Sequence, residues 1–284
     1  MRRGEIIGTE ISGPDDILYG ELKLFQPGLD AGPRVNVDTI LLAHFARFPD
    51  RAKAIELGCA HGAVSLIIAQ RRRKRKAWFD SALKPGDGTA VCAARQIDAF
   101  DINPSLIELA RKNAEINGLS GYVNFFTADL RNCRKNFEAG SYDAVVMNPP
   151  YDEAHKSRPS ASDAMASALH GAQCSLADVA AAAKYLLDNR GKLFLVMRAK
   201  RTTELFSLLD RNNVRPKRLR AVHPRPGRAA SVILVEAIRA SADGLVIEPP
   251  LFILGHDGKY TEELLEAYKL DEKYSPSGEI RCRS

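Results

Sequence analysis

Short apolar runs recur through the middle of the chain, and periodic segments of mixed polarity separate them. Runs that are apolar on both faces are typical of buried parallel strands, whereas apolar residues three or four positions apart are typical of helices. The pattern predicts strands over residues 52–57, 96–100, 122–127, 143–147 and 191–198. It predicts helices over residues 63–70, 104–117, 164–187 and 202–212. This alternation indicates an α/β fold around a mostly parallel sheet.

Two further strands are predicted over 218–223 and 230–238, and a short Pro- and Gly-rich segment joins them. So tight a connection predicts an antiparallel hairpin. If its first strand runs parallel to the main sheet, the turn lies at the edge where the parallel strands end. His223, Arg225 and Arg228 would then lie near the mouth of a site at that edge. The alternative is a plain hairpin with solvated cations.

The two ends of the chain predict smaller additions to this core. Alternating residues over 18–25 indicate a strand or hairpin arm, and Asp38 is a candidate N-cap for a helix over 39–48. Residues 251–268 indicate a strand-like segment and a short acidic helix. We therefore expect a lid packed on the main domain, the main domain itself and a C-terminal extension, over residues 1–50, 51–240 and 241–284.

The first strand of the main domain runs into a glycine-rich turn. Glu56 stands at the strand end, and Gly58, Ala60 and Gly62 alternate through the turn before the helix begins. A strand, a glycine-rich turn and a helix in this order bring backbone close to a nucleotide. His61 also lies in the turn, but a turn histidine is more often solvated, so we assign no chemistry to it.

Acidic residues end the next two strands. Asp101 is placed to accept hydrogen bonds from ribose hydroxyls, although it lies about 40 residues beyond the glycines instead of the usual 20 or so. Asp80 is nearer that spacing, but only Asp101 is followed by a plain helix. We attribute the excess to a basic insertion over about 71–95. Asp129 follows the third strand. It could cap a turn, but its place at a strand end beside the nucleotide site favours a contact to the amine of an adenine instead.

The fourth strand ends in Asn148-Pro149-Pro150-Tyr151, the stretch around which the other candidates gather. Proline fixes φ and has no N–H, so two prolines force the chain out of the sheet in a stiff turn with free carbonyls. The Asn148 side chain adds an acceptor, and Tyr151 adds a flat ring. Such a site suits a planar group that carries an NH2. The alternative is a structural turn with Tyr151 packed on the core.

Charge is unevenly distributed along the chain, whose formal net charge is +6. Residues 190–228 hold twelve Lys and Arg against Glu204 and Asp210, so 12 − 2 gives +10. The run Arg71–Lys76 is six consecutive cations, which predicts an exposed helix end or loop. A basic face of this kind predicts a polyanion as partner. The alternative is that the cations only solvate an exposed face.

Composition narrows the class of protein. With 284 residues, of which 45% are hydrophobic, the chain can bury one large core or two small ones. No run of about 18 apolar residues predicts a membrane helix, and the first residues lack the apolar core of a signal peptide. Five widely spaced cysteines without a Cys-x-x-Cys pair argue for a reducing cytoplasm and against a zinc site or disulfide scaffold. Neither a membrane nor a metal is therefore expected as a partner.

The glycine-rich turn, the two acids and the tetrapeptide together resemble class I S-adenosylmethionine-dependent methyltransferases. More narrowly, the sequence is similar to the bacterial valine-tRNA adenine-N6 methyltransferase group. This second resemblance is carried by the tetrapeptide, Asp38-x-x-Leu41-Leu42-Ala43 and His223-Pro224-Arg225-Pro226-Gly227. It covers about residues 15–268. Two departures are Ala60, where the cofactor turn usually has glycine, and the basic insertion.

The resemblance implies a Rossmann-like fold and S-adenosylmethionine as cofactor. The cofactor contacts that it implies are Glu56, Gly58, Ala60, Gly62, Asp101, Asp129 and Asn148. Asn148 and the Pro149 carbonyl would accept hydrogen bonds from the target amine, and Tyr151 would stack on a base taken out of its stack. The implied reaction is methylation of an exocyclic base amine, above all N6 of adenine in tRNA, with no metal and no strong base. The expected RNA contacts are His223, Arg225, Arg228, Arg71, Arg72 and Arg73.

Three other activities stay open at this point. Protein-glutamine methyltransferases share the tetrapeptide, but they carry a helical substrate domain for which 50 leading residues leave no room. A small-molecule O-methyltransferase would usually use a base or metal-binding acids near the mouth, and it would not need the basic face. A non-catalytic RNA-binding protein would keep the basic face but would have no use for Asp101 and Asn148 together.

Overall fold

The structure is a computed structural model that describes residues 13–28, 32–82, 95–149 and 174–270. Pro150 and Tyr151 of the tetrapeptide lie outside the described residues. Much of the expected basic insertion and the first half of the helix predicted over 164–187 also lie outside them.

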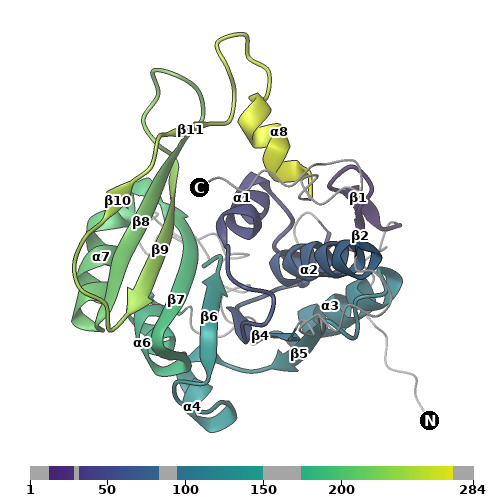
Figure 1. Ribbon diagram of the computed structural model, residues 1–284, viewed down its shortest axis with the longest axis horizontal. Coiled ribbons are helices and arrows are strands. Elements are labelled where there is room, and N and C mark those ends of the chain that lie inside the picture. The colour runs from purple at the N-terminus through teal and green to yellow at the C-terminus, as the bar shows by residue number, and fades with distance from the viewer. Residues whose placement is uncertain (1–12, 29–31, 83–94, 150–173, 271–284) are drawn as a thin grey trace, which may run out of the picture.

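A nine-stranded sheet of the described residues forms the centre of the molecule, in the order β10-β8-β9-β7-β6-β3-β4-β5, with β11 also paired to β8 (Figure 1). Its strands are β3 Ala54–Leu57, β4 Ile97–Asp101, β5 Val123–Thr127, β6 Tyr142–Met147, β7 Leu187–Arg198, β8 Val214–His223, β9 Val232–Arg239, β10 Val246–Ile247 and β11 Leu251–Phe252. Strands β3 to β7 are parallel, and β9 is antiparallel to both β7 and β8. The predicted α/β fold with a mostly parallel sheet and a C-terminal antiparallel hairpin is confirmed.

Helices cover both faces of this sheet, which explains why its central strands are unbroken apolar runs. All four residues of β3 are buried. The core on one face includes residues of α1 Val37–Phe45, α2 Ala63–Ala82, α3 Pro104–Ile116 and α8 Glu262–Tyr268. The core on the other face includes residues of α4 Cys133–Asn136, α6 Leu176–Leu186 and α7 Thr202–Arg211. None of the helices in the described ranges is both long and apolar enough to cross a membrane.

The N-terminal segment forms the predicted hairpin arm, as the antiparallel pair β1 Asp15–Ile17 and β2 Leu22–Leu24. Helix α1 then begins after Asn36, so the prediction of Asp38 as its N-cap is wrong. The Asn36 side chain accepts a hydrogen bond from Thr39 N at 3.0 Å, and the Thr39 side chain accepts one from Asn36 N in return. Asn36 has the same capping chemistry as Asp38 and the extended backbone that a cap requires. The division of the chain into lid, main domain and extension stays a prediction.

The basic run is not an exposed segment after a short helix, as the sequence predicted, because α2 continues through it to Ala82. Arg71 is 3% exposed, and its guanidinium donates to the Ala43 and Ala46 carbonyls, at 2.6 and 2.7 Å, near the end of α1. Arg73 donates to the Asn117 carbonyl beyond α3 at 2.6 Å. The last carbonyls of a helix have no partner within it, and the fork of donors on arginine suits them. The expectation that Arg71 contacts RNA is therefore wrong, whereas for the half-buried Arg73 it stays a prediction.

Arg72 is the most deeply buried of this run, at 1% exposed. Its guanidinium donates to the Arg95 carbonyl at 2.6 Å and to the Ala52 carbonyl at 3.0 Å, and it lies over the Phe48 ring. Burial lowers its pKa to about 10, although Asp50 opposes the shift. Arg72 therefore joins α2 to the segments that flank β3 and β4, and it is unavailable to a partner.

Replacing Arg72 with methionine should lower the free energy of unfolding by about 3 kcal/mol, because the buried Ala52 carbonyl and the part-buried Arg95 carbonyl lose their donor. The measurement is urea unfolding followed by circular dichroism. Lys74→Met is the matched control on the same helix. Lys74 forms a half-exposed pair with Glu21, and its loss should cost less than about 1 kcal/mol. Equal stability of the two variants would contradict a structural role for Arg72.

Candidate active site

The strand ends that carry the candidate residues lie side by side at one edge of the sheet. The last residue of β3 pairs with Phe100 of β4 and with Met147, the last residue of β6. Gly58, Asp101 and Asn148 come directly after these three paired positions, so they lie at one level of this edge. In open α/β sheets ligands bind at this carboxyl edge of the strands.

The glycine-rich turn between β3 and α2 has a left-handed backbone at three positions. Gly58, Ala60 and Gly62 have φ of 65°, 48° and 86°. A Cβ added to Gly62 would lie 2.8 Å from the Phe125 ring, so only glycine fits there. Ala60 tolerates the conformation at a cost of about 1–2 kcal/mol. Its backbone N–H donates to Asp101 Oδ2 at 2.9 Å, which helps to hold the turn in this shape.

Glu56 lies beneath the turn and is 3% exposed. Its Oε2 accepts hydrogen bonds from the Ser65 backbone N–H, at 2.9 Å, and from the Ser65 hydroxyl. Burial raises the pKa of this carboxyl to about 8, although the two hydrogen bonds from Ser65 oppose the shift. The side chain therefore fastens the strand end to the first turn of α2.

Asp101 contacts the turn on one side and its own helix on the other. Besides Ala60 N, the carboxylate accepts from Asn103 N at 2.9 Å, and Asn103 caps α3. Each carboxylate oxygen has two lone pairs, so Asp101 can accept further hydrogen bonds from a ligand. The structure therefore places Asp101, and not Asp80 within α2, at the end of the second parallel strand.

Asp129 caps the short helix η1 Leu130–Asn132, as one of its two predicted roles required. Its side chain accepts from Arg131 N at 2.9 Å and binds the Arg131 guanidinium through both oxygens, with one contact at 2.6 Å. Hydrogen bonding to Arg131 lowers the pKa of the Asp129 carboxyl. A contact from Asp129 to an adenine stays a prediction, and it would have to share the carboxylate with Arg131.

Asn148 directly follows β6, and the oxygen of its side chain lacks a hydrogen-bond donor among the described residues. Its Oδ1 is buried and receives no hydrogen bond from any residue that the structure describes. A buried polar atom without a partner costs about 1–3 kcal/mol, so such an atom calls for an explanation. Pro149 beside it is buried and offers no N–H. Asn148 Oδ1 is therefore placed to receive an N–H from outside the described chain.

His61, to which the sequence assigned only a solvated role, is in fact 3% exposed. Both ring nitrogens are buried without a hydrogen-bond partner among the described residues. Burial, followed by the charge of Arg34, lowers the pKa of His61 to about 4, so the ring is neutral at pH 7. Arg34 belongs to the N-terminal segment, which therefore lies close to the turn. No local signal in the sequence indicates this contact.

The hairpin turn between β8 and β9 lies at the same edge as the other candidates, because β8 runs parallel to β7. His223 Nδ1 is 2.7 Å from the Arg228 carbonyl, and its ring lies 5.4 Å from that of Phe252 on β11. His223 thus fastens the turn to β11. Arg225 and Arg228 are exposed, and neither side chain has a hydrogen-bond or ion-pair partner among the described residues.

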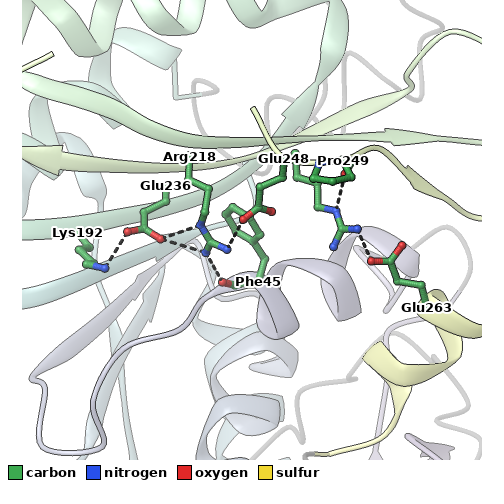
Figure 2. A network of polar contacts seen from close by, with 8 residues as sticks. Phe45, Lys192, Arg218, Glu236, Glu248, Pro249 and Glu263 are labelled. Atoms are coloured by element: carbon green, nitrogen blue, oxygen red, sulfur yellow. Dashed lines mark hydrogen bonds and ion pairs between the residues drawn. The ribbon is translucent and has the colours of Figure 1, made fainter. Parts of the chain in front are cut away.

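The basic segment 190–228 is much less open than its charge of +10 suggests. At least eight of its twelve cations interact with other groups of the protein: Lys192, Arg198, Lys200, Arg201, Arg215, Lys217, Arg218 and Arg220. Figure 2 shows how β7, β8, β9 and α1 are joined in this way around Arg218, which contacts Glu236, Glu248 and the Phe45 carbonyl. The expected basic face therefore shrinks to cations such as Arg225 and Arg228 at the hairpin.

The sheet order, with the glycine-rich turn, Asp101 and Asn148 at one edge, defines a Rossmann-like methyltransferase fold of class I. Residues 60–224, more than half of the chain, match the family model described as RMKL-like, methyltransferase domain, and the chain belongs to this family. It is an S-adenosylmethionine-dependent methyltransferase, with S-adenosylmethionine as cofactor.

Curated relatives point the same way at low identity. The chain is 22% identical over 232 residues to the tRNA1(Val) (adenine(37)-N6)-methyltransferase of Tolumonas auensis, covering 82% of this chain and 86% of the relative. The Aeromonas hydrophila enzyme of the same name is 24% identical over 233 residues, or 82% and 87% of the two chains. The crystal structure of a protein from Agrobacterium tumefaciens, described as a predicted O-methyltransferase, shares the fold with a TM-score of 0.60 and 19% identity. The match covers 82% of this chain and 97% of that protein.

Proposed function

We propose that this methyltransferase methylates an exocyclic amine of a nucleobase, with N6 of adenine in tRNA as the favoured target. The observation that carries the proposal is the buried, unpartnered Oδ1 of Asn148 at the carboxyl edge of the sheet. An amine satisfies this atom and still carries a proton while it attacks, whereas a phenolate nucleophile has no proton to give it. The names of the curated relatives support the same target.

The described residues suit S-adenosylmethionine at this edge. The turn presents a left-handed backbone at the start of the long helix α2, and a Cβ added to Gly58 would meet only Met147, at 4.0 Å. Asp101 has lone pairs for ribose hydroxyls, and Glu56 holds the turn from below. When bound, S-adenosylmethionine supplies a methyl group on a sulfonium, which is a good leaving group.

The protein has little bond chemistry to perform, so positioning dominates. Asn148 Oδ1 and the Pro149 carbonyl accept from the target amine and direct its lone pair toward the methyl group. These acceptors stabilise the positive charge that develops on nitrogen more than they stabilise the neutral amine. Tyr151, which lies outside the described residues, stacks on the extruded base in this proposal. The target amine loses its proton after transfer, and no strong base is needed for that step.

The deciding experiment is labelled methyl transfer from S-adenosylmethionine into purified tRNA, rRNA, protein and small phenols, followed by nucleoside analysis. N6-methyladenosine in tRNA is the expected product. Label in the phenols alone would replace the proposal with a small-molecule O-methyltransferase, and label in protein would favour a glutamine target. Such a tRNA substrate also implies that the enzyme works in the cytoplasm.

Removing the two free hairpin cations, in Arg225→Ala with Arg228→Ala, should weaken tRNA binding and also lower kcat. These cations can contact phosphate beside the target base, so their loss affects both affinity and orientation. We expect the slope of log Kd against log salt to fall by about one per lost contact. The measurement is methylation kinetics and filter binding at several salt concentrations.

The matched control replaces Arg190 and Arg211, which lie at the opposite edge of the sheet. This replacement removes the same amount of charge. Both are exposed and have no partner among the described residues. Arg190→Gln with Arg211→Gln should leave kcat unchanged. Equal losses in the two double variants would reduce the hairpin effect to net charge, and unchanged RNA affinity in both would favour a small-molecule substrate.

A further inference from the structure

Strand β2 has a helix, and not another strand, along one of its sides. The Lys23 backbone N–H donates to Asn117 Oδ1 at 2.9 Å, and Asn117 Nδ2 donates to the Lys23 carbonyl at 2.7 Å. Phe25, two residues on, pairs in the same way with Asn113, at 2.8 and 3.0 Å. A primary amide carries a donor and an acceptor side by side, so each asparagine takes the place of a neighbouring strand. The two lie one helical turn apart on the same face of α3.

Asn113 makes one contact that Asn117 does not. Its Nδ2 also donates to the His61 carbonyl in the glycine-rich turn at 3.0 Å, whereas Asn117 Nδ2 makes its other bond to the Asn113 carbonyl within α3. Asn113 is fully buried, and its acceptor and donors are all in use. One side chain therefore joins the N-terminal strand pair to the turn, and a chemically identical neighbour on the same helix does not.

The joined carbonyl belongs to the most conformationally demanding part of the turn. His61 lies between Ala60 and Gly62, both of which have a left-handed backbone. Asp101 holds the N–H on one side of this unit, and Asn113 holds the carbonyl. Unfavourable backbone conformations persist only where their surroundings determine them several times over. Loss of the Asn113 contact should therefore loosen the turn and not only the N-terminal strands.

We propose that Asn113 is a positioning residue that couples the docking of the N-terminal strand pair to the shape of the cofactor turn. Because such coupling is reciprocal, cofactor at the turn stabilises the docked strands, and the docked strands strengthen cofactor binding. The inference rests on the cofactor site proposed above. In this proposal the N-terminal segment affects cofactor binding through Asn113, and no residue of the segment needs to touch the cofactor.

The first test uses the wild-type protein and S-adenosylhomocysteine. Calorimetry measures binding, and amide hydrogen exchange with mass spectrometry measures opening of residues 15–25. We expect exchange in this segment to slow by about fivefold or more at saturation. Binding without any slowing overturns the coupling and leaves the proposed cofactor site intact. No binding at all overturns both.

The second test compares Asn113→Ala with Asn117→Ala. Each variant loses a side-chain amide that pairs with the backbone of Lys23 or Phe25. Only Asn113→Ala also releases the His61 carbonyl. We expect it to raise the Kd for S-adenosylhomocysteine about tenfold and to abolish the slowing of exchange. Asn117→Ala should lower Tm but keep Kd within about twofold and keep the slowing. Equal Kd values in the two variants overturn the proposal, and the wild-type test decides it if Asn113→Ala does not fold.

Discussion

Replacing Asn148 with alanine should lower kcat by about 10²–10³-fold while leaving cofactor affinity within a few-fold. This is the usual loss when one positioned polar contact to a transition state is removed. The buried Oδ1 has no donor among the described residues, so its deletion breaks no contact that they make and should cost little stability. The measurements are single-turnover methylation of tRNA and calorimetric binding of S-adenosylhomocysteine.

Two further variants sharpen this prediction. Asn148→Asp keeps an acceptor oxygen at the same position, so it should retain more activity than Asn148→Ala. Asn132→Ala is the matched control, because Asn132 is exposed and makes no capping hydrogen bond with its side chain. Wild-type turnover by Asn148→Ala would reduce the tetrapeptide to a structural turn. A large drop in cofactor affinity, with kcat kept, would place Asn148 on the cofactor instead of the amine.

Replacing Asp101 with alanine should weaken S-adenosylmethionine binding by about 1.5–3 kcal/mol, or about 10–150-fold, the scale of hydrogen bonds to a charged group. Two causes act together. The ribose hydroxyls lose their acceptor, and the Ala60 N–H loses the carboxylate that holds the turn. Asp101→Asn keeps one acceptor oxygen, so its affinity should fall between those of the wild type and Asp101→Ala. Isothermal titration calorimetry measures all three.

Two aspartates serve as controls for this loss. Asp98 lies on the same strand and bonds to Tyr142 and Asn124, away from the edge where ligands bind. Asp80 lies within α2. Asp98→Ala and Asp80→Ala should each leave cofactor affinity within about twofold. If Asp101→Ala binds normally while either control binds weakly, the proposed cofactor site is wrong.

The local pattern of apolar residues was enough to predict the strands of the sheet, because each strand is recognisable from a few consecutive residues. Both faces of β3 are buried, so the strand is recognisable from four consecutive residues. Two prolines end β6 by their own covalent geometry. A parallel sheet then brings the ends of its strands to one edge, and this alone predicts that Asp101 and Asn148 lie near the turn.

The surroundings of the cations could not be predicted in this way, because the charge of a residue does not indicate which partner it contacts in the fold. Arg71 and Arg72 have the same sequence signature as a solvated basic run, yet both are buried against carbonyls from segments twenty or more residues away. Arg218 likewise meets Glu248 and the Phe45 carbonyl only because α1 packs over the sheet. Arg225 and Arg228 differ from them only in having no such partner among the described residues.

The sequence by itself determined the class of fold, and it predicted the glycine-rich turn and the strand end at Asn148, because each depends on the backbone preferences of a few neighbouring residues. Only the tertiary structure decided that His61 is buried, that Glu56 holds the turn from below and that Asn113 differs from Asn117. These roles depend on contacts across 9 to 88 positions of the chain, the separations of Glu56 from Ser65 and of Phe25 from Asn113. Hydrogen-bonding side chains are satisfied by whatever group packing brings within about 3 Å, and no local pattern encodes that distance.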